Sequence, residues 1–291
     1  MDNTRRGHLT AAAAPWYRRP RASFSPNYLR IAMTQKILLP SDAIETPYLA
    51  RLDALANTVF RHPAMNNAFY GEWRTRRFSL QEFHIFSTNY FRRVYATPTR
   101  ISIALTTIQD WISRIELLHN LTDELGEGTA ANVHVLVLFR WLDALNSALG
   151  CAEPYRNVLD RSTPLPATQR FIDETNAMCG KSPQHAAGAL LAQEWHGYTQ
   201  IAYLLDGFQN YRHLFGVHDF HDACEYFYVH LGRAEKEHRT QSSVIAARNC
   251  QTDQDFAIVE AAFNGYLDLL YSFWESISAE YSERNIPLAI R

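Results

Sequence analysis

The sequence has few cysteines and no cysteine motif. Its 291 residues contain Cys151, Cys179, Cys224 and Cys250, scattered without a Cys-x-x-Cys pair. This spacing argues against a disulfide framework and a thiolate zinc site, and it favours a reducing compartment. The sequence also lacks the run of about 18 apolar residues that a membrane-spanning helix needs. A net charge of −2 supplies no basic field for nucleic acid. We therefore expect a cytoplasmic protein that binds neither membrane nor nucleic acid.

Motifs of several common enzyme classes are also missing. The sequence has no Gly-rich loop for phosphate, no nucleophile elbow and no convincing set of Ser, His and Asp. No stretch shows the period-two alternation of a half-buried strand, so a sheet is not expected.

Residues 1–35 differ in composition from the rest of the chain. They hold a single acid, Asp2, show no apolar period, and contain six arginines: Arg5, Arg6, Arg18, Arg19, Arg21 and Arg30. Such a composition is typical of a disordered segment. We predict a disordered basic leader at 1–35, followed by one domain at 45–285.

From residue 45 onward, apolar residues recur at helical spacing. Leu49, Leu52 and Leu55 follow the three-to-four-residue period, and Ser79 with Glu82 forms a capping box that opens a helix. Further helices are predicted at 99–122, 131–149, 167–179, 184–207, 219–248 and 252–281. The pattern predicts an all-α protein, a single bundle of about seven or eight helices whose gaps are filled by aromatic side chains.

Two Glu-x-x-His pairs lie in these predicted helices. They are Glu116 with His119 and Glu235 with His238, and each pair has a glutamate on an earlier helix, Glu82 or Glu194. The spacing i, i+3 aims a carboxylate and an imidazole at one point. Di-iron sites in helical bundles take such ligands from several helices. One reading is therefore a ferritin-like di-iron protein that uses Glu82, Glu116, His119, Glu194, Glu235 and His238.

A second pattern overlaps the first, in the segment NLTDELGEGTAANVHVLVLFRWLDALNSALG at 120–150. Glu124 ends one predicted helix and His134 lies on the next. Gly126 and Gly128 permit a tight reversal between them, so Glu124 and His134 could face the same point.

This segment resembles the haem-oxygenase-like di-iron oxidases and oxygenases, which are related to the thiaminase and pyrroloquinoline-quinone-synthase folds. The resemblance extends over about 48–280 and includes 62–94, the stretch EYFYVHLGRAEKEH at 225–238, and FWESI at 273–277. It implies a haem-oxygenase-like helical bundle that holds two Fe ions, Fe2+ or Fe3+, with dioxygen as co-substrate. The implied metal ligands, which are also the catalytic residues, are Glu124, His134, Glu194, His230, Glu235 and His238.

The sequence departs from the usual family pattern His-x-x-x-Asp-x-x-His. Here His230 lies five residues before Glu235, and a straight helix with about 100° per residue turns His230 away from Glu235 and His238. A one-residue π-bulge near Gly232 would restore convergence. The alternative is that one of the three side chains is not a ligand.

The resemblance implies a non-haem di-iron oxygenase or oxidase in specialised metabolism. Its expected substrate is a small organic molecule, an amino acid, an amine or a fatty-acid-like compound, which undergoes N-oxygenation or oxidative C–C cleavage. An external electron donor and a homodimer are expected partners. The alternatives are a metal-free hydrolase or cofactorless oxidase of the same fold, and a non-catalytic helical binding protein. Arg100, Arg114 and Arg140 are candidates to bind a substrate carboxylate, and their spacing singles out none of them.

Overall fold

The computed structural model describes residues 47–283, except for the side chains of 233–237. All of these residues lie in one compact unit. The predicted basic leader at 1–35 falls outside the described residues.

Residues 47–283 form helices connected by turns, and this part of the chain contains no strand. The all-α prediction is therefore confirmed for it. The α-helices are α2 (Tyr48–Asn57), α3 (Ala68–Thr75), α4 (Leu80–Tyr95), α5 (Thr97–Thr107), α6 (Trp111–Glu124), α7 (His134–Ala148), α8 (Tyr155–Arg161), α9 (Pro166–Lys181), α10 (Pro183–Phe208), α11 (Val217–Ala223), α12 (Glu225–His230), α13 (Arg233–Arg248) and α14 (Asp253–Glu283).

The expected count of seven or eight helices is too low, because two predicted helices are divided. The helix expected at 99–122 becomes α5 and α6, since Ile108 is extended and Asp110 caps a new helix by accepting a hydrogen bond from the Ser113 N–H. The helix expected at 219–248 becomes α11, α12 and α13. The short helices α3 and α8 were not predicted. Apolar periodicity continues across such breaks, so it does not reveal them.

The capping box at the start of α4 is confirmed. The Ser79 hydroxyl accepts from the Glu82 N–H, and the Glu82 carboxylate accepts from the Ser79 N–H. Pro98 lies in the first turn of α5, where its missing N–H costs no helical hydrogen bond. It therefore starts a new helix directly after α4.

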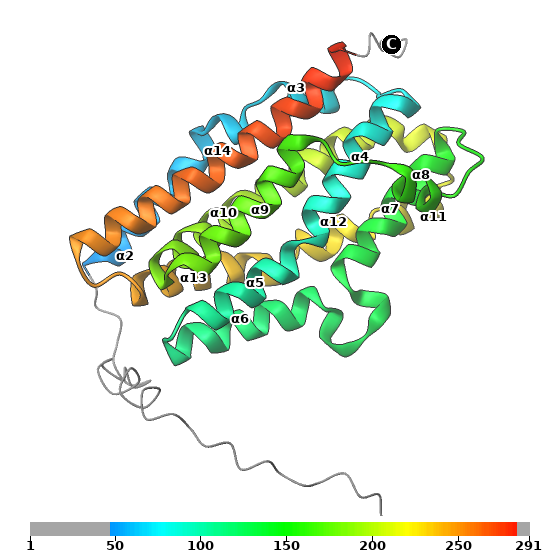
Figure 1. The fold of residues 1–291 in the computed structure, drawn as a ribbon. Coiled ribbons are helices and arrows are strands. Elements are labelled where there is room, and N and C mark those ends of the chain that lie inside the picture. The colour runs from blue at the N-terminus through cyan, green and yellow to red at the C-terminus, as the bar shows by residue number, and fades with distance from the viewer. Residues whose placement is uncertain (1–46, 284–291) are drawn as a thin grey trace, which may run out of the picture. The chain divides into compact units, whose positions relative to one another are not determined.

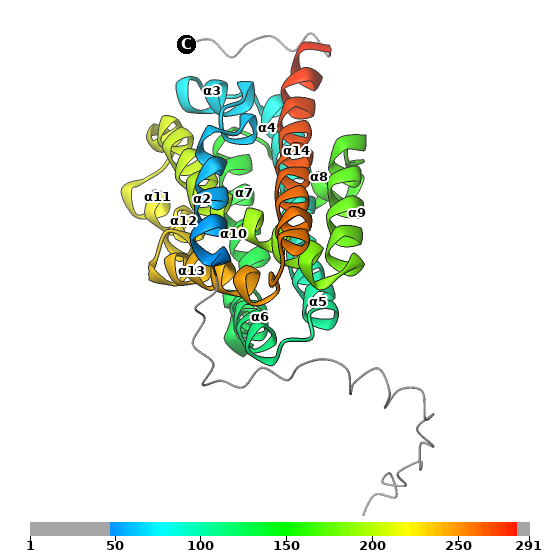
Figure 2. The same cartoon turned by 90° about the vertical axis from the view of Figure 1, so that its left-hand side faces the viewer.

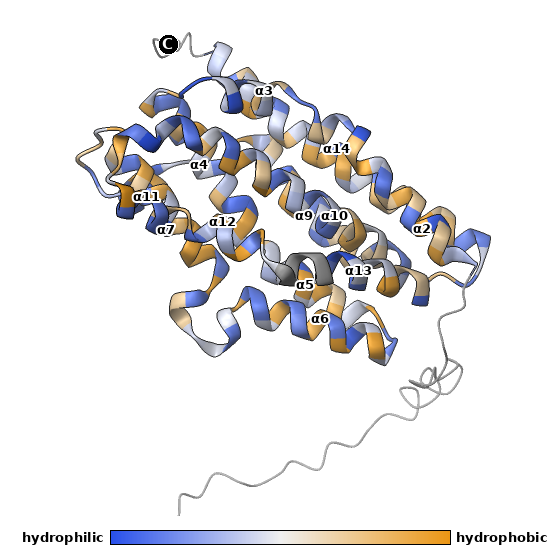
Figure 3. Ribbon diagram, turned by 180° about the vertical axis from the view of Figure 1, so that it is seen from behind, coloured by the Kyte–Doolittle hydropathy of each residue, from blue (hydrophilic) through white to orange (hydrophobic). Residues whose placement is uncertain are grey.

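Helix α10 packs against α14, α13, α9 and α3 (Figures 1 and 2). Two glycines let its neighbours approach closely. A Cβ atom on Gly188 would overlap the carbonyl oxygen of Val259 on α14, and one on Gly207 would overlap the Trp73 indole on α3. Figure 3 shows apolar and hydrophilic residues interspersed along the helices, as expected for amphipathic helices around a shared core.

The core is rich in aromatic rings. Trp274 of α14 lies 4.4 Å from Phe69 and 4.9 Å from Tyr70 between ring centroids, and 5.9 Å from Tyr90. Aromatic pairs at these separations add to the stabilisation that burial provides. The prediction that aromatic side chains fill the gaps between helices is therefore confirmed.

Substitution of Gly188 by Ala should destabilise the protein by about 1–3 kcal/mol, because the added methyl group must displace backbone. Gly197 lies on the same helix with no atom within 4 Å of an added Cβ. Gly197→Ala should therefore leave the stability unchanged or raise it by roughly 0.5–1 kcal/mol. Urea unfolding measures both, and equal effects of the two substitutions would contradict the close packing of α10 on α14.

Candidate metal centre

A tight reversal between α6 and α7 brings Glu124 to His134. Glu124 is the last residue of α6 and His134 the first of α7. Gly126 and Gly128 between them have φ of 73° and 81°, and a Cβ on Gly126 would lie only 2.5 Å from the Val133 nitrogen. The chain can thus reverse only because glycine occupies this position. Glu124 Oε2 and His134 Nδ1 are 3.6 Å apart, as the sequence predicted.

The two side chains influence each other's protonation. Burial opposes ionisation of Glu124, but the His134 imidazole lowers the pKa of the Glu124 carboxyl below its ordinary value. Burial likewise opposes protonation of His134, and the Glu124 carboxylate nevertheless raises the pKa of that imidazole. Each group therefore favours the charged form of the other, and a bound cation would take the place of the imidazole proton.

His230, at the end of α12, is buried beside His134, with ring centroids 4.5 Å apart. Its Nδ1 lies 2.7 Å from the Tyr226 carbonyl oxygen. Because a carbonyl can only accept, Nδ1 carries the proton and Nε2 keeps its lone pair. Burial, reinforced by the nearby His134, lowers the pKa of His230 to about 4. A neutral imidazole held by a backbone carbonyl is the usual form of a histidine metal ligand.

The helix that carries His230 does not continue to His238. Helix α12 ends at His230, Gly232 is extended with φ −72° and ψ −168°, and α13 begins at Arg233. The proposed π-bulge near Gly232 is therefore wrong, because the chain breaks the helix there. Because His230 and His238 lie on separate helices, the angle of about 100° per residue in one continuous helix does not hold them apart. The side chain of Glu235 lies outside the described residues, so its role as a ligand stays a prediction.

Glu194 enters from α10 and is buried. Its Oε1 accepts hydrogen bonds from Asn120 Nδ2 at 3.1 Å and from Gln193 Nε2 at 3.2 Å. Burial raises the pKa of the Glu194 carboxyl, and the negative charge of Glu124 adds to this effect, whereas His238 opposes it. The side chain is thus oriented by two amides and lies in the electrostatic field of Glu124 and His238.

Asp123 is a member of this cluster that sequence reasoning missed. Its Oδ2 lies 3.8 Å from His134 Nε2 and 3.9 Å from His238 Nε2. The acid pair Asp123-Glu124 was visible in the sequence, but neighbouring helical residues point about 100° apart. At the last turn of α6 both acids nevertheless face the returning chain.

The sequence model of one protein family, described as an iron-containing redox enzyme, matches residues 84–267. This range includes every residue of the cluster. The chain belongs to this family of iron-containing redox enzymes.

Several solved structures are similar to this chain in fold. A CADD-like protein of unknown function from Nostoc punctiforme is 16% identical with a TM-score of 0.64, and the match covers 81% of this chain and 99% of that chain. A TenA homolog from Pseudomonas syringae is 15% identical with a TM-score of 0.64, covering 84% and 99%. A domain with a heme oxygenase-like fold from Shewanella denitrificans is 14% identical with a TM-score of 0.59, covering 83% and 95%. The predicted haem-oxygenase-like fold is therefore confirmed.

A comparison with curated proteins finds no match. No helix within the described ranges is long and apolar enough to cross a membrane.

The cluster fits the iron that the family description implies. Its donors are carboxylate oxygens and imidazole nitrogens, which iron accepts. His134 Nδ1 is buried without a hydrogen-bond partner, and its 3.6 Å separation from Glu124 exceeds hydrogen-bonding distance. Two ligands of one metal ion with bonds of about 2.1 Å lie roughly 3–4 Å apart, and the 3.6 Å between Glu124 Oε2 and His134 Nδ1 falls in this range. As placed, no three described His, Cys, Asp or Glu side chains already form a group that could hold a metal ion. Small side-chain movements would therefore accompany binding.

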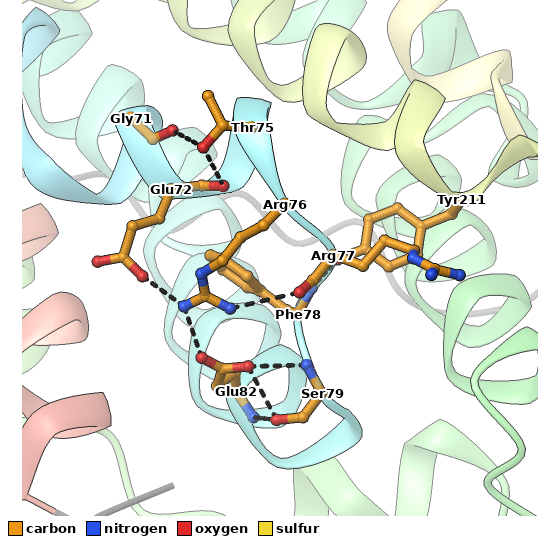
Figure 4. A network of polar contacts seen from close by, with 9 residues as sticks. All are labelled: Gly71, Glu72, Thr75, Arg76, Arg77, Phe78, Ser79, Glu82 and Tyr211. Carbon is orange, nitrogen blue, oxygen red and sulfur yellow. Dashed lines mark hydrogen bonds and ion pairs between the residues drawn. The ribbon is translucent and has the colours of Figure 1, made fainter. Parts of the chain in front are cut away.

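Two members of the ferritin-like ligand set, Glu82 and His119, have surroundings that do not suit a metal ligand. Glu82 accepts hydrogen bonds from Ser79, and its Oε1 lies 2.6 Å from Arg76 Nη2, a network drawn in Figure 4. The His119 side chain is 68% exposed and has Glu116 3.9 Å away. Glu82 therefore caps α4, and His119 lies exposed on the surface of α6.

We expect Gly126→Ala to separate Glu124 from His134, because the new methyl group overlaps the backbone near Val133. It should weaken Fe2+ binding and lower the free energy of unfolding by more than the roughly 1–2 kcal/mol that a left-handed alanine costs. Gly128→Ala is the matched control, since Gly128 has a similar φ but open space around it. Iron titration and urea unfolding measure both variants, and identical behaviour would refute a role for the close approach at Gly126.

Proposed function

We propose that this chain is a non-haem di-iron enzyme that uses dioxygen to oxidise or oxygenate a small organic substrate. The observation that supports it best is the approach of acids and imidazoles from α6, α7, α10, α12 and α13 to one another in a largely buried region. The family description supports iron and redox chemistry, and the di-iron oxygenase assignment goes beyond it. The proposed ligands are Glu124, His134, Glu194, His230, Glu235 and His238.

The protein residues would hold and orient the iron. Glu124 and Glu194 provide negative charge that a buried site can keep only beside cations. His230 offers Nε2 because the Tyr226 carbonyl oxygen binds its Nδ1 proton. Asn120 and Gln193 both donate to Oε1 of Glu194, which leaves Oε2 available. When bound, ferrous iron supplies electrons and coordination positions for dioxygen.

The surroundings of the cluster would exclude water from the reaction. The Tyr226 ring lies 4.5 Å from the His230 ring and stacks on Trp141 at 5.6 Å. Tyr226, Trp141 and their neighbour Phe227 are all buried. Aromatic side chains that exclude water would strengthen electrostatic interactions at the cluster and would protect reactive species from side reactions. An amino acid, an amine or a fatty-acid-like molecule remains the proposed substrate, with N-oxygenation or oxidative C–C cleavage as the outcome.

Iron uptake tests this function. Folded protein reconstituted anaerobically with Fe2+ should bind about two irons per chain and then consume dioxygen when it is admitted. His134→Ala should lose at least one iron, because it removes a buried ligand. The matched control is His119→Ala, which removes an exposed histidine of α6. Absence of iron uptake by the folded protein would favour a metal-free enzyme, and equal losses in both variants would contradict the assigned site.

Asp123 should contribute to iron affinity although the family pattern does not include it. We expect Asp123→Asn to weaken Fe2+ binding by about 10–100-fold, as substitutions beside metal ligands do. Glu260→Gln is the control, since Glu260 is an exposed acid on α14. Competition with a chelator of known affinity measures both, and an unchanged affinity for Asp123→Asn would remove this residue from the centre.

A further inference from the structure

Two arginines are buried in the interior, and no acid among the described side chains pairs with either of them. Arg93 on α4 is 5% exposed and Arg100 on α5 is 1% exposed. A guanidinium stays charged at every relevant pH, so an arginine in a protein interior is normally paired with a carboxylate. Among the side chains that the structure describes, no ion pair or hydrogen bond joins either arginine to an acid.

Three other arginines have partners that account for their positions. Arg248, which is also buried, binds both oxygens of Asp110 at 2.6 and 2.8 Å. Arg140 is exposed and bound to Glu225, and Arg114 stacks over the ring of Trp111. A carboxylate therefore accompanies the buried Arg248, whereas no described carboxylate accompanies Arg93 or Arg100. Of the three arginines that the sequence offered as carboxylate binders, the structure singles out Arg100.

Each of the two guanidiniums retains a donor without a partner. Arg100 donates from Nε to Thr175 at 3.0 Å and from Nη1 to Gln193 at 2.6 Å, whereas its Nη2 is buried and has no partner. Arg93 donates from Nη2 to Gln200 at 2.8 Å, and its Nε is buried and has no partner. A buried donor without an acceptor destabilises the protein unless a ligand or a water molecule accepts its hydrogen bond.

The two arginines share one neighbourhood. Their guanidinium carbons lie 5.5 Å (Arg93) and 5.3 Å (Arg100) from the centre of the Phe171 ring. Around Arg93 the rings of Tyr90, Phe273 and Trp274 are each within 6 Å of its guanidinium carbon. These rings present an apolar surface, and none of them neutralises the charge.

Short chains of hydrogen bonds connect this neighbourhood to the candidate metal centre. Arg100 holds Gln193, which donates to the ligand candidate Glu194.

On the other side, Gln200 accepts from Arg93 and donates to the Tyr90 hydroxyl at 3.4 Å. The Tyr90 hydroxyl lies 2.7 Å from that of Tyr226, the residue whose carbonyl oxygen accepts the His230 proton. The arginines are therefore a few side chains from Glu194 and from His230.

We propose that Arg93 and Arg100 together bind the carboxylate of the substrate, so that the enzyme acts on small organic carboxylates. The two carboxylate oxygens would accept from Arg93 Nε and Arg100 Nη2, the donors left without partners. The surrounding aromatic rings would contact the apolar body of the molecule, which extends toward the cluster at Glu124 and His134. An amine without a carboxylate is then a poor substrate. This inference rests on the proposed function, because only that function identifies the bound carboxylate as the substrate.

Binding of simple carboxylates to the metal-free protein tests the inference. Calorimetry with hexanoate and benzoate, each compared with its uncharged amide, measures recognition of the anion while no iron is present to bind it. The carboxylates should bind and the amides should not. Arg93→Gln and Arg100→Gln should each weaken binding by about 10–100-fold, the usual effect of losing a charge-assisted hydrogen bond. Arg140→Gln, which removes a surface arginine bound to Glu225, is the matched control and should bind as the wild type does.

Circular dichroism and thermal unfolding show whether each variant is folded. If a glutamine variant does not fold, Arg93→Lys and Arg100→Lys keep the charge and remove the planar fork, and they should still weaken binding. Absence of carboxylate binding by the folded wild type, equal binding of the amides, or unaffected variants would overturn the assignment. Tighter binding of inorganic phosphate than of either carboxylate would also overturn it. Because iron uptake is measured separately, failure of the metal centre and failure of this anion site are distinct results.

Discussion

The placement of two carboxylates, the buried Glu194 and the partly buried Glu124, among three imidazoles is the constraint on which this structure depends. An acid removed from water loses several kcal/mol of hydration unless positive charge accompanies it. In the metal-free protein, part of this need is met by His134, which lowers the pKa of the Glu124 carboxyl. Another part is met by the amides of Asn120 and Gln193, which donate hydrogen bonds to Glu194. Iron would meet it more fully, because a divalent ion neutralises both acids without adding a proton.

Helix α10, which packs at the centre of the core, also contributes side chains to the candidate metal centre and its surroundings. Along α10, Gly188 and Gly207 allow close packing on α14 and α3, while Gln193, Glu194 and Gln200 face the polar interior. The position of Glu194 is therefore fixed by the packing of the whole protein. The aromatic core around Trp274 has a second consequence, because it surrounds Arg93 with rings that accept a cation without neutralising it.

Local signals predicted the local features of the fold well. The capping box at Ser79 and the glycine reversal between α6 and α7 were correct, since each depends on residues close in the chain. Apolar periodicity failed where a helix stops without losing its pattern, as between α5 and α6. It failed again at Gly232, where the expected distortion of one helix is a break between two. Apolar periodicity shows which face of a helix is buried, but it does not show where one helix ends and the next begins.

The sequence by itself determined the all-α architecture, the approach of Glu124 to His134 and the kinds of side chain that lie near them. These follow from helical period, from glycine at a positive φ and from the chemistry of the donors. Only the tertiary structure decided that Asp123 lies near His238, that Glu82 binds Arg76 and that His119 is exposed. It also decided that no acid among the described side chains pairs with the buried Arg93 and Arg100. Such relations join residues far apart in the chain, and helix packing alone sets those distances.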